Sequence, residues 1–252
     1  MKLDIVAVLP PLIEAVTSTG VLGRAVAQGI LDVAVHDLRD FTTDRHRSVD
    51  DVPYGGGPGM VLKLEPFVRA LDRIRASRGE PRAVVLTSPQ GTPFTHAEAV
   101  RLSALGHVVL LCGRYAGVDE RVREHVATEE LSIGDYVLSG GELPACVILD
   151  AVARQVPGVV GDRDCVDGDS FVRRLLDCPH YTRPAELDRH RVPEVLMSGN
   201  HAAIRSWRKR EALRRTRERR PDLLADASLD DEERAILRAL DQADTQNTEV
   251  GA

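Results

Sequence analysis

Cysteines are few in this sequence, and long apolar runs are missing. The four cysteines among 252 residues are too widely spaced to form Cys-x-x-Cys metal or redox pairs. We therefore expect reduced, mostly structural thiols in a cytoplasm, and no residue is assigned as a metal ligand. No apolar run reaches the roughly 18 residues that a membrane-spanning helix needs. No signal peptide is expected either, because Asp4 interrupts the first apolar run and Pro10-Pro11 follows it.

The glycine motifs of common nucleotide-binding proteins are also missing, although four glycines stand between residues 55 and 59. Met60 occupies the place of the last glycine of a dinucleotide-binding fingerprint. No Gly-Lys-Ser/Thr follows, which excludes a phosphate-binding P-loop. We interpret residues 41–59 as one polar, glycine-rich loop.

The charge is distributed unevenly along the chain. The net charge of −6 argues, taken alone, against a nucleic-acid partner. Residues 205–220, however, hold nine basic and two acidic side chains, a local charge of +7, so the rest of the chain carries −13. One interpretation is a solvated helix face with ion pairs such as Arg214 with Glu218. Because two acids cannot neutralise nine bases, we favour contact with RNA.

Apolar runs and amphipathic segments alternate through the first 160 residues. The expected strands are 3–9, 31–35, 83–86 and 107–112, and the expected helices are 21–28, 63–77, 95–105 and 119–126. Thr95-x-x-Glu98 is a capping box that begins the third of these helices. Strands that alternate with helices predict an α/β fold with a largely parallel sheet covered on both faces.

Three polar loops follow expected strands of this sheet, namely 87–91, 112–121 and the segment Glu130–Pro144. In an α/β sheet such loops gather at one edge, where ligands bind. Gly134, Gly140 and Gly141 leave backbone N–H and C=O groups exposed, which suits a ligand read through its hydrogen-bonding edges, such as adenine. The alternative is a tight connection between a strand and the apolar helix 143–156.

The remainder of the chain reads as a linker and a helical region. Residues 157–170 are rich in glycine and aspartate, which predicts a flexible acidic linker. Asn200 can cap a helix from His201 to Arg220, and Ser228-x-x-Asp231 can begin a short one. The predicted organisation is an α/β domain at 1–160, a linker at 161–172, a helical domain at 173–240 and a disordered tail at 241–252.

The three loops, with the segments Val49–Met60 and Cys178–Pro184, closely resemble the bacterial tRNA (guanine-N1)-methyltransferases of the TrmD type, a SPOUT family. The resemblance runs from residue 1 to about Leu224. It implies a deep trefoil knot in the sheet, and methyl transfer from S-adenosylmethionine to N1 of the guanosine 3′ of the tRNA anticodon. It further implies a homodimer whose active sites are shared between subunits, with tRNA and no membrane as partners.

The resemblance also assigns residues. Asp169 is implied as the general base, and Arg154 as the cation that stabilises charge on guanine O6. The implied cofactor site comprises Ser88, Pro89, Gln90, Gly91, Gly113, Ile133, Gly134, Asp135, Tyr136, Val137, Leu138, Gly140, Gly141 and Pro144. The implied RNA-binding residues are Arg183, Arg208, Arg214, Arg215 and Arg217.

One position departs from the family pattern, which usually reads Gly-Arg-Tyr-Glu-Gly where this chain has Ala116. Any role of that carboxylate, including Mg²⁺ coordination, is therefore in question here. Two alternatives to the tRNA enzyme are a knotted methyltransferase acting on ribosomal RNA or ribose, and a non-catalytic RNA-binding protein. The second would not bind S-adenosylmethionine tightly.

Overall fold

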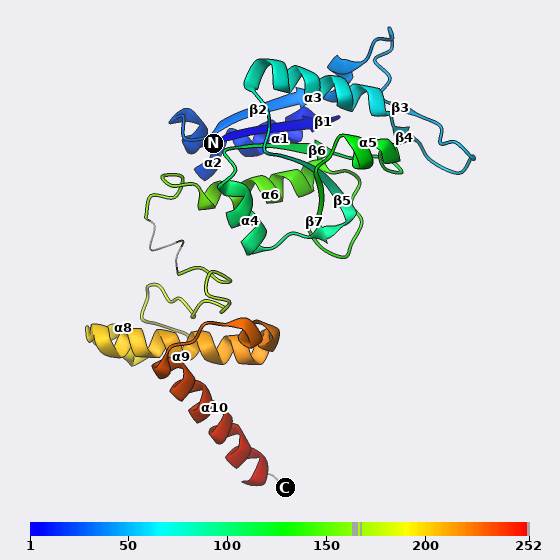
Figure 1. The fold of residues 1–252 in the computed structure, drawn as a ribbon. Helices are drawn as coiled ribbons and strands as arrows, with labels where there is room; N and C mark the ends of the chain where they lie inside the picture. Colours follow the sequence, from blue (N-terminus) through cyan, green and yellow to red (C-terminus); the bar gives the residue numbers. More distant parts are fainter. Residues whose placement is uncertain (163–165, 167, 251–252) are drawn as a thin grey trace. The chain divides into compact units, whose positions relative to one another are not determined.

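The computed structural model describes residues 1–162, 166 and 168–250. The chain divides into two compact units, Met1–Arg163 and Asp164–Ala252 (Figure 1). The predicted linker at 161–172 includes residues 163–165 and 167, so Asp164 and Asp167 lie outside the described residues. Among the helices of the described residues, none is long and apolar enough to cross a membrane.

A five-stranded parallel sheet forms the centre of the first unit, which confirms the predicted α/β class. Its order is β2-β1-β6-β5-β7, and every neighbouring pair is parallel. The strands are β1 (Lys2–Ala7), β2 (Asp32–Asp37), β5 (Ala83–Pro93), β6 (His107–Cys112) and β7 (Glu129–Ser132). The central strand β6 is buried along its whole length, as expected for an apolar run in a sheet covered on both faces.

Helices cover both faces of this sheet (Figure 1). On one face, Ala83 and Val85 of β5 belong to a core shared with α1 (Pro10–Thr17), α2 (Gly20–Ala27), α4 (His96–Ser103) and α6 (Glu142–Gln155). On the other, Val84 and Leu86 belong to a core shared with η1 (Leu38–Phe41), α3 (Leu64–Arg78) and α5 (Glu120–His125). Successive side chains of one strand thus fill two separate cores.

Two expectations about the first unit need correction. The expected loop 87–91 is part of β5, which continues to Pro93 with an irregular register between Thr87 and Thr92 against β7. The loop 41–59 is interrupted by β3 (Asp50–Asp51), which pairs antiparallel with β4 (Val61–Leu62). Both differences arise from pairing with segments distant in sequence, which local composition does not encode.

The second unit is mainly helical, with a small core made by Leu175, Leu213 and Leu240. Its elements are β8 (Glu186–Leu187), β9 (His190–Arg191), α8 (Glu194–Met197), α9 (His201–Arg219), η2 (Pro221–Asp226) and α10 (Asp231–Val250). The Asn200 cap of α9 is confirmed, since Asn200 Oδ1 accepts the Ala203 N–H at 3.2 Å.

Helix α10 differs from its prediction in both its beginning and its length. Asp230 Oδ1 accepts the Glu233 N–H and Glu233 Oε2 accepts the Asp230 N–H, both at 2.8 Å, so the capping box is Asp230-x-x-Glu233. The predicted pair of Ser228 and Asp231 stands two residues too early. Residues 241–250, expected to be disordered, continue the helix, because extending a formed helix costs far less than starting one.

Candidate active site

The middle of β5 and the segments that follow β6 and β7 line a cavity of about 370 Å³ at the carboxyl edge of the parallel sheet. All the predicted cofactor residues line it except Gly91 and Asp135. The residues of that prediction brought together here are Ser88, Pro89, Gln90, Gly113, Ile133, Gly134, Tyr136, Val137, Leu138, Gly140, Gly141 and Pro144. A volume of this size falls within the range of small-molecule sites in proteins.

Close backbone contacts between the three segments explain two of the glycines. A Cβ on Gly141 would lie 2.2 Å from Thr87 Oγ1 and 2.8 Å from the Gly113 N atom. The Gly141 N–H in turn donates to the Gly113 carbonyl at 2.7 Å. Gly91 does not face the cavity; a Cβ there would lie 2.6 Å from the Glu130 carbonyl carbon, so this glycine allows β5 to pack against β7.

The segment after β7 presents its backbone and side chains to the cavity from one side. Ser132 Oγ accepts the Gly134 N–H at 3.2 Å, and the Tyr136 N–H donates to the Gly134 carbonyl at 2.9 Å. This tight turn leaves the side chains of Tyr136 and Val137 exposed on the cavity rim. An apolar rim that is exposed on the cavity suits a flat heterocycle.

A buried ion pair, which the sequence reasoning missed, lies in the cavity wall. Arg114 Nη1 lies 3.2 Å from Oε2 of Glu142, a side chain that is only 1% exposed. Burial, and after it the Glu142 charge, raises the pKa of the Cys112 and Cys146 thiols. These thiols are thus unreactive neighbours of the cavity, as expected from the cysteine spacing.

The two predicted catalytic residues belong to different units. Arg154 lies in the last turn of α6 and is partly buried. Asp169 is also partly buried, and its N–H donates to the Val166 carbonyl at 3.1 Å. After it, Ser170 Oγ accepts the Asp177 N–H at 2.9 Å, which closes a compact loop. The roles of both residues stay predictions.

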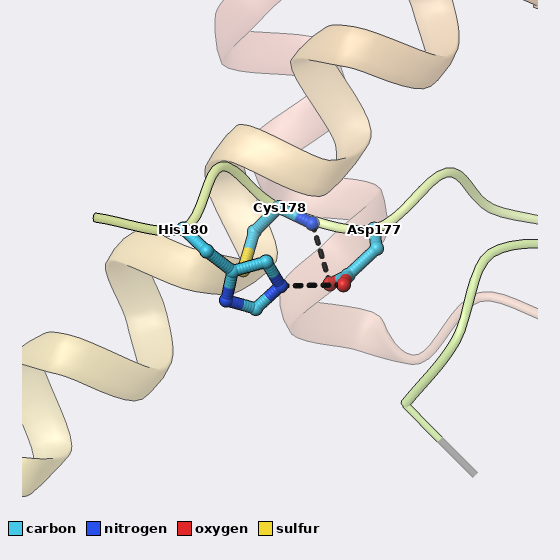
Figure 2. Close-up of side chains that lie close together, drawn as sticks. All are labelled: Asp177, Cys178 and His180. Carbon is cyan, nitrogen blue, oxygen red and sulfur yellow. Dashed lines mark hydrogen bonds and ion pairs between the residues drawn. The ribbon is translucent and has the colours of Figure 1, made fainter. Parts of the chain in front are cut away.

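A second group of polar side chains, also missed from sequence, comprises Asp177, Cys178 and His180 (Figure 2). One potential ligand atom from each lies within 4.8 Å of the others, and carboxylate, thiol and imidazole are metal-ligand types. Asp177 is already engaged, because its Oδ1 accepts the Cys178 N–H and its Oδ2 lies 2.6 Å from His180 Nε2. We therefore interpret the group as a hydrogen-bonded turn.

The turn places His180 in the wall of another cavity, of about 440 Å³, within the second unit. Burial raises the pKa of the Cys178 thiol, and the charge of Asp177 adds to this effect. For Asp177 itself, burial would raise the pKa, but the hydrogen bonds from His180 and the Cys178 N–H lower it overall. Arg183 and Arg208, both predicted to bind RNA, line the same cavity.

The basic helix α9 is more neutralised than its own sequence indicates, because acids outside it pair with its bases. Lys209 Nζ bonds Asp230 and Glu232, Arg217 bonds Asp241, and Arg220 bonds Asp222. Arg214 bonds Glu211 and Glu218, which confirms the ion pair expected there. Within the described residues, the helix cations without an ion pair are Arg205, Arg208, Arg210, Arg215 and Arg219.

Comparison with known proteins agrees with the resemblance seen in the sequence. The profile of the family described as tRNA (Guanine-1)-methyltransferase TrmD matches residues 1–226. A tRNA (guanine-N(1)-)-methyltransferase of Aromatoleum aromaticum is 50% identical over 240 residues, 94% of this chain and 91% of that protein. Proteins of the same name are 50% identical in Geobacter metallireducens (96% and 98% covered) and 51% identical in Serratia marcescens (94% and 93% covered). Because these matches cover nearly the full length of this chain and of each relative, the chain belongs to the TrmD family of tRNA (guanine-1)-methyltransferases.

Proposed function

We propose that this protein transfers a methyl group from S-adenosylmethionine to N1 of the guanosine 3′ of the tRNA anticodon, in the cytoplasm. The observation that carries the proposal is the cavity at the carboxyl edge of the parallel sheet, which Gly113 and the turn after β7 line. The chain that forms this cavity belongs to the TrmD family. S-adenosylmethionine supplies a methyl group that its sulfonium already activates. The protein therefore has to bind the cofactor, orient it toward the guanine and remove the proton from N1.

The residues around the cavity fit such a cofactor. Exposed backbone between Ile133 and Leu138 can bond the edges of adenine, while the Leu138 and Pro144 side chains offer apolar surface to its faces. Ala116 also lines the cavity and contributes no carboxylate, so the acidic side chains of the wall are those of Glu120 and Glu130. A Mg²⁺ requirement is not part of the proposal.

Chemistry at guanine N1 requires a base and a cation. N1 carries a proton and is a poor nucleophile until that proton leaves, and negative charge then develops on O6. We assign proton removal to Asp169 and charge stabilisation to Arg154, whose guanidinium stays protonated and offers a planar set of donors. Folding the segment around Asp169 over bound RNA would desolvate the carboxylate and make it a stronger base.

The proposal includes a homodimer whose sites combine Arg154 of one subunit with Asp169 of the other. It is supported by exposed apolar side chains on α1 and α6, which pack against each other in the first unit. Leu12 lies on α1, Leu143 and Val147 lie on α6, and the exposed Leu9 immediately precedes α1. An exposed apolar surface of this kind is typical of a subunit interface. We also propose that the sheet contains the trefoil knot of the family and that the three segments lining the cavity form this knot.

Transfer RNA is the proposed partner of the second unit. Arg208 and Arg215 of α9 have no acidic partner within the described residues and are free to bond phosphates, whereas Arg214 is engaged by two glutamates. Arg183 and His180, beside Arg208, add further donors in the wall of the second cavity.

The test measures transfer of labelled methyl to two tRNA transcripts, one with guanosine and one with adenosine after the anticodon. Label on the guanosine transcript alone, lost in Asp169→Ala although cofactor still binds, would support the reaction and the base. Label on neither transcript despite bound cofactor would overturn the substrate and point to ribosomal RNA. Absence of cofactor binding would favour a non-catalytic RNA-binding protein.

A further inference from the structure

Arg114 is held in the wall of the first cavity by a carboxylate that solvent does not reach. The side chain of Glu142 is 1% exposed and that of Arg114 is 22% exposed. Both oxygens of Glu142 are used: Oε2 lies 3.2 Å from Arg114 Nη1, and Oε1 accepts the Leu9 N–H at 3.2 Å. Glu142 also occupies the first residue of α6, where the helix dipole stabilises a negative charge.

The ion pair crosses directly over Gly140. A Cβ on Gly140 would lie 2.4 Å from Glu142 Oε2 and 2.8 Å from Arg114 Nη1. Any larger residue at this position would therefore displace the pair. The arrangement brings the guanidinium against Gly140, in the segment that leads into α6, and Arg114 and Gly140 both line the cavity.

Most donors of Arg114 remain available to a ligand. A guanidinium carries five N–H groups, and in the described part of the chain Glu142 is the one side chain that bonds it. The other arginine of the cavity wall, Arg123, is bonded instead to Glu120 on the surface of α5. A partly buried arginine that is fixed in position and retains free donors is well suited to bind a carboxylate through two parallel hydrogen bonds.

We propose that Arg114, oriented by Glu142, binds the carboxylate of the methionine part of S-adenosylmethionine. This inference rests on the proposed function, and it assigns the one negatively charged group of that cofactor to a specific side chain. Arg114 is then a cofactor-binding residue, and Glu142 is a positioning residue that acts through it.

The test compares the dissociation constants of S-adenosylmethionine and decarboxylated S-adenosylmethionine, measured by titration calorimetry on the full chain. Arg114→Gln should weaken the binding of S-adenosylmethionine about tenfold or more, and the binding of the decarboxylated compound less than about threefold. Glu142→Gln should weaken binding in the same selective manner but to a smaller extent. Arg101→Gln, which changes an ion-paired arginine of α4 outside the cavity wall, is the matched control and should leave both constants unchanged.

Each other result is decisive. Equal weakening of both compounds by Arg114→Gln, or no weakening, would overturn the inference while leaving the proposed function in place. If the wild-type protein binds neither compound, the proposed function itself fails. Should Arg114→Gln not fold, Arg114→Lys keeps the charge but loses the planar set of donors, and must still weaken S-adenosylmethionine selectively.

Discussion

Asp4 Oδ1 lies 2.6 Å from His36 Nε2, although the Asp4 side chain is completely buried in the middle of the sheet. Its other oxygen lies 2.8 Å from His107 Nε2, and Arg78 Nε lies 2.9 Å from the same carboxylate. One carboxylate on β1 thereby bonds side chains from β2, β6 and α3. A buried charge is tolerated here because both carboxylate oxygens accept hydrogen bonds.

Asp4→Asn should destabilise the first unit by about 1–3 kcal/mol, because His36, His107 and Arg78 lose the buried carboxylate that they share, although Arg78 keeps its second acidic partner, Asp32. The free energy of unfolding in urea measures the effect. Asp72→Asn, an exposed position on α3, is the control and should change stability by less than about 0.5 kcal/mol. Equal stability of the Asp4 variant and the wild type would contradict a structural role for this network.

The same carboxylate predicts a dependence of stability on pH. Burial would raise the pKa of Asp4, but hydrogen bonds from His36, His107 and Arg78 outweigh it and lower the pKa below its usual value. A carboxyl with a lowered folded-state pKa stabilises the protein above the unfolded-state value of about 3.9, and this contribution is lost as pH falls through the folded-state pKa. Urea titrations at pH 5, 3.5 and 2.5, which extend below the unfolded-state pKa, should therefore show a smaller loss of stability on acidification in Asp4→Asn than in the wild type. An identical pH slope in both proteins would rule Asp4 out as the titrating group.

Gly141→Ala should abolish cofactor binding and destabilise the protein by about 1–3 kcal/mol, because the new Cβ would lie 2.2 Å from Thr87 Oγ1. Thermal unfolding and titration calorimetry with S-adenosylmethionine measure the two effects. Gly161→Ala is the control, since a Cβ there meets no atom within 4 Å. Normal cofactor affinity in Gly141→Ala would show that the three segments need not approach so closely.

The secondary structure of the first unit could largely be predicted from the sequence, since strands such as His107–Cys112 are short apolar runs and Thr95 caps α4 through a local hydrogen bond at 3.4 Å. Pairings between residues that are distant in the sequence could not be predicted from it. Arg114 and Glu142 are 28 positions apart, and nothing in either segment marks the other as its partner. The neutralisation of α9 is a similar case, since Lys209 is paired with Asp230, which caps the next helix, and with Glu232 in its first turn.

Ion pairing within the second unit predicts unequal roles for two arginines of α9. Arg208→Ala should weaken tRNA binding and reduce the slope of affinity against salt concentration by about 1, as expected for loss of one phosphate contact. Arg214→Ala should have a smaller effect, because Glu211 and Glu218 already compensate that charge. Filter binding at several KCl concentrations provides both slopes. A larger effect for Arg214 would show that RNA displaces its acidic partners.

The sharing of active sites can be decided by mixing two inactive variants. Arg154→Ala and Asp169→Ala should each be inactive alone, because each removes one proposed catalytic group from every site. In a mixed dimer with shared sites, one site lacks both groups and the other retains both. Random association makes half of the dimers mixed, so unfolding and refolding an equal mixture should restore about one quarter of wild-type methyl transfer. If both groups came from the same subunit, every site would carry one defect and the mixture would stay inactive. Refolding each variant alone is the control, and it must remain inactive for the restored activity to be assigned to sites built from two chains.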